Sequence, residues 1–97
     1  MRIDLLLKYL CLVKSRSIAK SLCENGAIRI GVRRARPSSA VREGDRLTLE
    51  LRGGSLLIEV LEIPKKQLSR SAAPQYYQRI EWTPRSTMDE EFWEEDR

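Results

Sequence analysis

The sequence predicts an α+β fold in which two N-terminal helices precede a small, mostly antiparallel β-sheet. Apolar residues recur at helical spacing over the first 24 residues, and from Ala27 onward they alternate with a period of two. Glycine-containing turns then separate the alternating segments. Helices followed by strands are typical of an α+β domain, and 97 residues suit a single small one.

The leucine-rich stretch at residues 4–13 predicts the first helix. Its apolar side chains form two stripes, so we expect the helix to contact other elements on two sides. The stripes are Leu6, Leu7, Leu10 and Val13, and Leu5, Tyr9 and Leu12. Asp4 is placed as an N-cap or as a first-turn acid, where it interacts favourably with the helix dipole.

A second helix is predicted from an N-cap at Ser15 to about Glu24, and Asn25-Gly26 ends it. Arg16 and Lys20 lie four residues apart on the face opposite its apolar residues. Like charges at this spacing slightly oppose helix formation. These two residues therefore indicate a role other than local stability.

The remaining regular structure is predicted as short strands that end at glycine or proline. Gly31 suits a turn or bulge, Gly53-Gly54 a hairpin, and Pro64 ends the last strand. The alternating segments are 28–33, 47–51 and 56–63.

The predicted organisation is one domain with two C-terminal additions. Residues 1–64 form the domain and its extra hairpin, and residues 65–82 form an extension that packs on it. Residues 72–82 are expected to form a short turn or an extended segment. Its apolar side chains pack back on a candidate contact site at Leu5, Tyr9 and Leu12; they are Tyr76, Tyr77, Ile80 and Trp82. Residues 83–97 carry a formal charge of −4, against +8 for residues 1–82, which predicts a disordered acidic tail.

The composition argues against an enzyme. The chain has no histidine, so the commonest general base and metal ligand is missing. Cys11 and Cys23 lie in apolar runs and are predicted as buried, reduced thiols. We expect no cofactor and no metal. The apolar run 5–13 is too short to span a bilayer and no signal peptide is recognisable, so we expect a soluble, cytoplasmic protein.

The positive charge of the first half indicates a polyanionic partner. Eleven lysines and arginines against four acids give residues 1–46 a formal charge of +7. Few aromatic residues accompany them, which favours phosphate contacts and shape recognition of structured RNA over base stacking. The candidate RNA-binding residues are Arg2, Lys8, Lys14, Ser15, Arg16, Lys20, Arg33, Arg34 and Arg36. We expect Arg33, Arg34 and Arg36 to close a site centred on Arg16 from the side of the sheet.

Several landmarks resemble the S4 RNA-binding domain over roughly Met1 to Leu51. They are Arg2-Ile3-Asp4, Leu7, Ser15-Arg16, Ala19, Gly26-Ala27-Ile28-Arg29-Ile30 and Gly44-Asp45. With its extra hairpin and Tyr77, the chain looks most like the free-standing members of this family, the fifteen-kilodalton small heat-shock and RqcP-like proteins of ribosome quality control. The resemblance implies RNA contacts by Arg2, Lys14, Ser15, Arg16 and Lys20, and an Asp4 that orients the helix start or an arginine.

The resemblance also implies a function. We expect a non-enzymatic monomer that binds ribosomal RNA and tRNA on the large ribosomal subunit carrying peptidyl-tRNA. There it would assist quality control of stalled nascent chains, with no membrane involved.

Two other functions remain open at this level. The chain could be an RNA-binding accessory subunit of a tRNA or rRNA modification enzyme or synthetase. Alternatively, it could be a protein-interaction module whose acidic tail, with Phe92-Trp93, docks on a partner or restrains the basic face.

Overall fold

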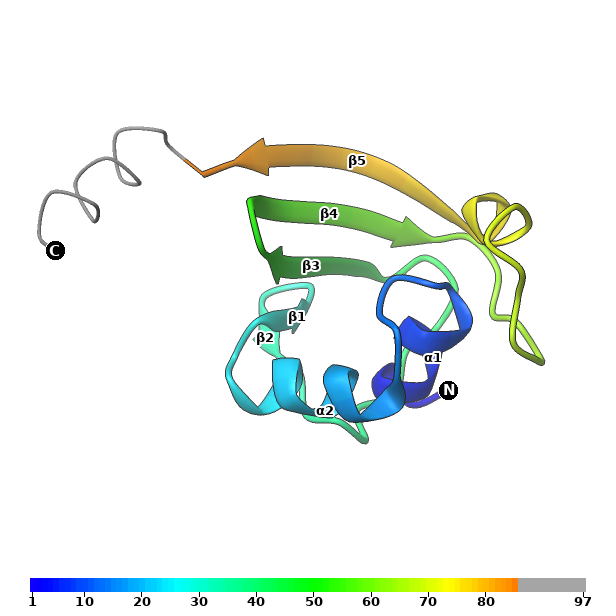
Figure 1. The fold of residues 1–97 in the computed structure, drawn as a ribbon, viewed down its shortest axis with the longest axis horizontal. Coiled ribbons are helices and arrows are strands. Elements are labelled where there is room, and N and C mark those ends of the chain that lie inside the picture. Colours follow the sequence, from blue (N-terminus) through cyan, green and yellow to red (C-terminus); the bar gives the residue numbers. More distant parts are fainter. Residues whose placement is uncertain (86–97) are drawn as a thin grey trace, which may run out of the picture.

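Two helices pack on one face of a five-stranded antiparallel sheet, which confirms the predicted fold class (Figure 1). The computed structural model describes residues 1–85. The helices are α1 (Ile3–Tyr9) and α2 (Arg16–Glu24), and a 3-10 helix, η1, covers Ala73–Tyr76. The sheet order is β2-β1-β3-β4-β5. Its strands are β1 (Ile28–Ile30), β2 (Arg33–Arg34), β3 (Arg46–Leu51), β4 (Gly54–Val60) and β5 (Tyr77–Pro84).

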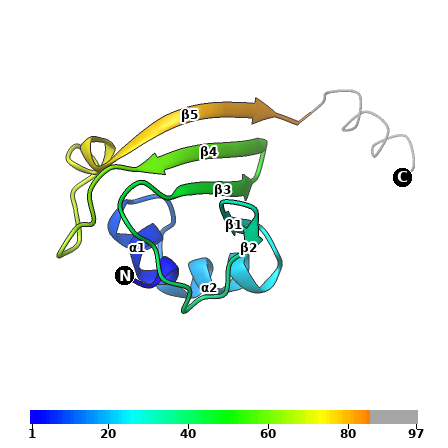
Figure 2. The same cartoon turned by 180° about the vertical axis from the view of Figure 1, so that it is seen from behind.

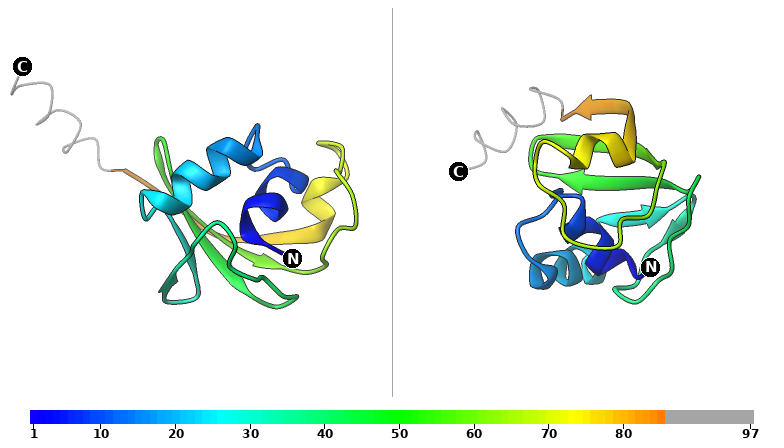
Figure 3. Two further views of the ribbon diagram at one scale, coloured as in Figure 1. Left: turned by 90° about the horizontal axis from the view of Figure 1, so that it is seen from below. Right: turned by 90° about the vertical axis from the view of Figure 1, so that its right-hand side faces the viewer.

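The hydrophobic core lies between the helices and the sheet (Figure 3). Alternate residues of β3 and β4 point into it, as the period of two predicts. Buried side chains of α1 meet them from the other side. The core includes Ile3, Leu6, Leu7, Leu10, Ile28, Leu47, Leu49, Leu56, Ile58 and Val60.

Helix α1 ends at Tyr9, so the prediction that it continues to Val13 was wrong. The chain reverses at Cys11, whose φ of 59° is left-handed. The N–H of Cys11 donates to the carbonyl of Lys8, and the N–H of Leu12 donates to that of Leu7. These two bonds form a Schellman C-cap, a position that glycine usually occupies. Because cysteine stands there, the sequence carries no recognisable stop signal.

Helix α2 matches its prediction at both ends. The hydroxyl oxygen of Ser15 accepts a hydrogen bond of 3.2 Å from the N–H of Ile18, as an N-cap does. At the other end Gly26, with φ of 77°, occupies the left-handed position of a second Schellman C-cap.

The strands differ from the prediction at their ends. Val32 is 96% exposed in the turn between β1 and β2, so it does not continue the buried alternation. Arg33 and Arg34 form the short β2 and not a plain connection. The β3–β4 hairpin is as predicted, but β4 begins at Gly54 and ends at Val60, three residues before the predicted end.

Residues 77–84 form a fifth strand, so the end of the 72–82 segment takes the extended form and not the turn. Tyr76 and Tyr77 pack against the core, whereas Ile80 and Trp82 are 38% and 47% exposed. Thr83 and Pro84, the first residues of the predicted tail, lie in β5. The rest of the tail prediction, including Phe92-Trp93, concerns residues 86–97, which lie outside the described residues.

Candidate nucleic-acid interface

The N-terminus is fixed by the connection between β2 and β3, which runs beside both helices (Figure 2). Arg2 forms an isolated antiparallel bridge with Ala40. The N–H of Ile3 donates to the carbonyl of Ser39 at 2.8 Å, and the N–H of Val41 donates to that of Met1 at 2.8 Å. These contacts fix the backbone of Arg2 at the start of α1.

The carboxylate of Asp4 joins the beginnings of α1 and α2. Its side chain is fully buried, at 0% exposure. Arg2 donates to it twice, from Nε to Oδ1 at 3.0 Å and from Nη2 to Oδ2 at 3.1 Å. Arg16 donates from Nε to Oδ2 at 3.2 Å. We call these three residues the Asp4 cluster. Asp4 therefore orients two arginines, where the resemblance implied one or the helix start.

The hydrogen bonds of the Asp4 cluster stabilise the charged carboxylate. Burial by itself raises the pKa of Asp4, because it removes the charge from water. The hydrogen bonds from Arg2, Arg16 and the N–H of Leu5 outweigh this effect, and the pKa lies below its ordinary value. Asp4 is therefore charged at neutral pH and holds both guanidinium groups in place.

Both arginines still face solvent. Their side chains are 44% and 45% exposed. A guanidinium has five N–H donors. In the guanidinium of Arg16, Nε is the one atom that donates a hydrogen bond within residues 1–85. Arg16 is also the first residue of α2, where backbone N–H groups and the helix dipole favour an anion. This end of α2 therefore presents unused N–H donors and a favourable dipole to an anion such as phosphate.

The other predicted residues of this face extend along α2. Lys20 is exposed one turn beyond Arg16. Arg34 lies at the opposite end, where its guanidinium donates to the carbonyl of Glu24 and packs beside Gly26. A helix rises 1.5 Å per residue, so Arg16 and Glu24 are separated by roughly 12 Å. Arg34 therefore extends the basic face along α2 and does not close the site around Arg16.

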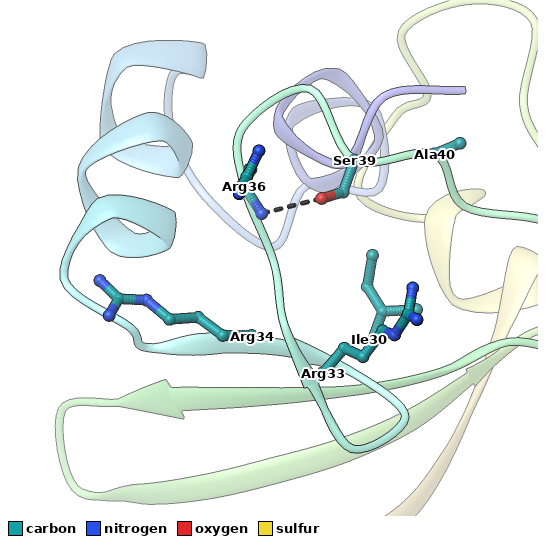
Figure 4. Close-up of a pocket in the computed structure, with 6 residues that line it drawn as sticks. All are labelled: Ile30, Arg33, Arg34, Arg36, Ser39 and Ala40. Carbon is teal, nitrogen blue, oxygen red and sulfur yellow. Dashed lines mark hydrogen bonds between the residues drawn. The ribbon is translucent and has the colours of Figure 1, made fainter.

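Arg33, Arg34 and Arg36 all line a hollow of about 520 Å³ that β2 and the following loop form. Figure 4 shows Arg34 extending towards α2, with Arg33 on the other side beside Ile30. The backbone N–H of Arg36 donates to the hydroxyl of Ser39 at 2.8 Å. Arg34 and Arg36 also line a second hollow against the end of α2. The three arginines thus lie around one hollow beyond the end of α2.

Lys8 and Lys14 line a different hollow, of about 580 Å³, at the end of α1. Residues 67–70 form its other wall and contribute Gln67 and Arg70, which the sequence analysis missed. We call this hollow the α1 groove. Arg70 follows Lys14 by 56 positions, so no local spacing indicated that they meet.

The described residues offer little for other chemistry. Residues 1–85 contain no cluster of acids and cysteines that could hold a metal ion. In the same region, no helix is long and apolar enough to cross a bilayer. Both cysteines are free; Cys23 is buried, and burial raises the pKa of its thiol, whereas Cys11 is only partly buried.

Comparison with known proteins gives the class of this protein. Residues 1–47 match the S4 domain family, which covers both helices and the start of β3. The whole fold resembles heat shock protein 15 of Vibrio cholerae, solved as a trimer, with a TM-score of 0.76 and 25% identity. That match covers 99% of this chain and 91% of the other.

Two bacterial relatives define the family more narrowly. The chain is 34% identical over 76 residues to the RQC P-site tRNA stabilizing factor of Bacillus subtilis, which covers 78% of this chain and 88% of the relative. It is 30% identical to the factor of the same name from Halalkalibacterium halodurans, over 78% and 86% of the two chains. The chain belongs to the family of RQC P-site tRNA stabilizing factors.

Proposed function

We propose that this protein binds ribosomal RNA and tRNA on the large ribosomal subunit that carries peptidyl-tRNA, and so assists quality control of stalled nascent chains. The observation that carries the proposal is the Asp4 cluster, in which a buried acid positions two half-exposed arginines at the start of α2. The family supports the choice of ligand, since its members are named for stabilizing P-site tRNA.

The proposed mechanism is binding without catalysis. Arg16 and the first N–H groups of α2 hold one phosphate, and Lys20 and Arg34 contact phosphates further along the same face. Because the positions of these cations are set by a helix, they match the backbone of folded RNA better than that of a flexible strand. Contacts to both RNAs at once would hold the tRNA in one position.

Sedimentation with large subunits that carry peptidyl-tRNA tests this proposal. The protein should move with the subunits, and Arg16→Ala should weaken binding by about tenfold or more, since it removes charge-assisted hydrogen bonds. Arg46→Ala is the matched control. It removes the same charge from the sheet face opposite the helices, where Arg46 pairs with Glu59 at 3.3 Å.

The outcomes separate the alternatives. A wild-type protein that stays at the top of the gradient contradicts the proposal. A stable enzyme partner recovered without ribosomal RNA would indicate an accessory subunit. Equal binding by Arg16→Ala and Arg46→Ala would remove the Asp4 cluster from the interface.

We further propose that the protein acts as a cytoplasmic monomer, because ribosomes are cytoplasmic and the strongly basic residues 1–82 repel their own copies. Light scattering at physiological salt should give the mass of one chain, 11.3 kDa.

A further inference from the structure

The α1 groove is a second basic surface, separate from the Asp4 cluster. Lys8, Lys14 and Arg70 contribute three cations, and none of the residues within 1–85 that line the groove is acidic. The other lining residues are uncharged, so every charged side chain of the described lining is a cation. A hollow with this charge favours an anion.

The far wall of the groove is attached to the end of α1 by specific hydrogen bonds. The side-chain amide of Gln67 donates to the carbonyl of Lys8 at 3.0 Å and to that of Tyr9 at 3.3 Å. The N–H of Leu68 also donates to the carbonyl of Tyr9 at 3.3 Å. These acceptors are carbonyls of the last turn of α1, where the helix supplies fewer N–H donors, and that of Lys8 also accepts from the N–H of Cys11.

A third contact fixes the same segment from the turn after α1. The thiol of Cys11 donates to the carbonyl of Leu68 at 3.2 Å. Together these bonds place the backbone two residues before Arg70 against α1. Arg70 itself makes no hydrogen bond or ion pair within residues 1–85, so its guanidinium is free to bind a ligand.

The chemistry of the groove suits the phosphates of an RNA backbone. Arginine offers a forked pair of donors to a phosphate, and lysine offers a point charge. No aromatic side chain of residues 1–85 lines the groove, so this part of the chain offers no platform on which a base could stack. Lys14 precedes the N-cap Ser15 of α2, so the groove adjoins the surface that Arg16 begins.

We propose that the α1 groove binds the phosphate backbone of a second RNA segment, and that Arg70 completes it from outside the part of the chain that matches the S4 domain. This inference rests on the proposed function and assigns to the protein a second contact with the same ribosomal complex. The two surfaces would hold two RNA segments at a fixed separation, since both are built on the short helix α1 and the turn that follows it.

The test is the salt dependence of binding to large subunits that carry peptidyl-tRNA. Each phosphate contact adds about one to the slope of log affinity against log salt. Arg70→Ala should reduce the slope by about one and the affinity by about two- to fivefold. Its unfolding temperature should equal that of the wild type, since the side chain has no partner among the described residues.

Lys66→Ala is the matched control, because it removes a charge from the same segment. Lys66 lines a different hollow together with Glu43 and Glu62, so its charge is offset by acids. We expect Lys66→Ala to keep the wild-type slope. Arg70→Lys should keep most of the slope, because the charge remains.

The proposal that the groove binds RNA and the proposed function are contradicted by different results. If the wild type binds and Arg70→Ala keeps its slope, as Lys66→Ala does, the groove is not an RNA contact and the proposed function stands. If the wild type does not bind the subunits, the proposed function is contradicted, and so is the proposal that the groove binds RNA.

Discussion

The Asp4 cluster and the α1 groove are both basic surfaces on α1, but their cations are positioned in different ways. In the Asp4 cluster, a buried carboxylate fixes Arg2 and Arg16 by side-chain hydrogen bonds of 3.0–3.2 Å. In the α1 groove, backbone contacts of a distant segment bring three cations together, and none of the three pairs with an acid within residues 1–85. The first arrangement fixes the direction of N–H donors, and the second mainly concentrates charge.

The difference has an energetic consequence. A buried carboxylate is costly unless it is paired and hydrogen-bonded, so the arginines of the Asp4 cluster stabilise the fold as well as forming part of the proposed interface. The lysines of the groove, Lys8 and Lys14, form no ion pair within residues 1–85 and have no such role in the fold. Substitutions in the Asp4 cluster should therefore lower both stability and binding, whereas substitutions in the α1 groove should lower binding alone.

The largest expected effect is the loss of both partners of Asp4. Arg2→Ala with Arg16→Ala leaves a buried charge without a counter-ion and should destabilise the fold by about 3–5 kcal/mol. Lys8→Ala with Lys14→Ala removes the same charge from the groove and should change stability by about 0.5 kcal/mol or less. Urea unfolding monitored by circular dichroism measures both. Equal unfolding midpoints for the two double variants would contradict the structural role of the arginines.

A smaller effect is expected in the pH dependence of stability. The pKa of folded Asp4 lies below its ordinary value of 3.8, so between the two pKa values the unfolded chain binds more protons than the folded one. The stabilisation is complete above pH 3.8 and is lost as the pH falls through the folded pKa. Asp4→Asn cannot titrate, so its stability deficit relative to the wild type should shrink below that pH. A deficit that stays constant from about pH 6 to pH 2.5 would contradict the lowered pKa.

The two helix ends show which part of the fold the sequence could predict. Gly26 indicates the end of α2, because glycine adopts a φ of 77° without strain. Cys11 adopts a similar conformation at the end of α1, but nothing in its residue type indicates it. The predicted first helix therefore extends four residues beyond the observed end of α1. A tertiary contact holds this turn: the thiol of Cys11 donates to the carbonyl of Leu68, and the two residues are 57 positions apart in the sequence.

The sequence left β5 open between a turn and an extended segment for a different reason. Within residues 1–85 it is an edge strand that pairs only with β4, and seven of its eight residues are exposed. Its sequence alternates charged and apolar residues only over 79–82, and Tyr77 is out of phase with Ile80 and Trp82, so the pattern is shorter than those of β3 and β4. Charged residues such as Arg79 and Glu81 protect an edge strand from unwanted pairing.

The candidate site was predictable where it is local. Ser15, Arg16 and Lys20 follow from the start and period of one helix, and the resemblance added Asp4 as the residue that orients an arginine. Arg34 was predicted as a site residue but placed at the wrong end of α2. Gln67 and Arg70 could not be found, because only the folded chain brings residues 67–70 against α1.

Asp4→Asn tests whether Asp4 positions Arg2 and Arg16 for RNA. The variant keeps the shape of the side chain and makes the protein more positive by one charge. If charge alone governed binding, affinity for large subunits carrying peptidyl-tRNA would rise. We expect it to fall by about three- to tenfold, in a protein shown to be folded by circular dichroism, because the guanidinium groups lose their charged acceptor. Equal or tighter binding by Asp4→Asn would contradict the account.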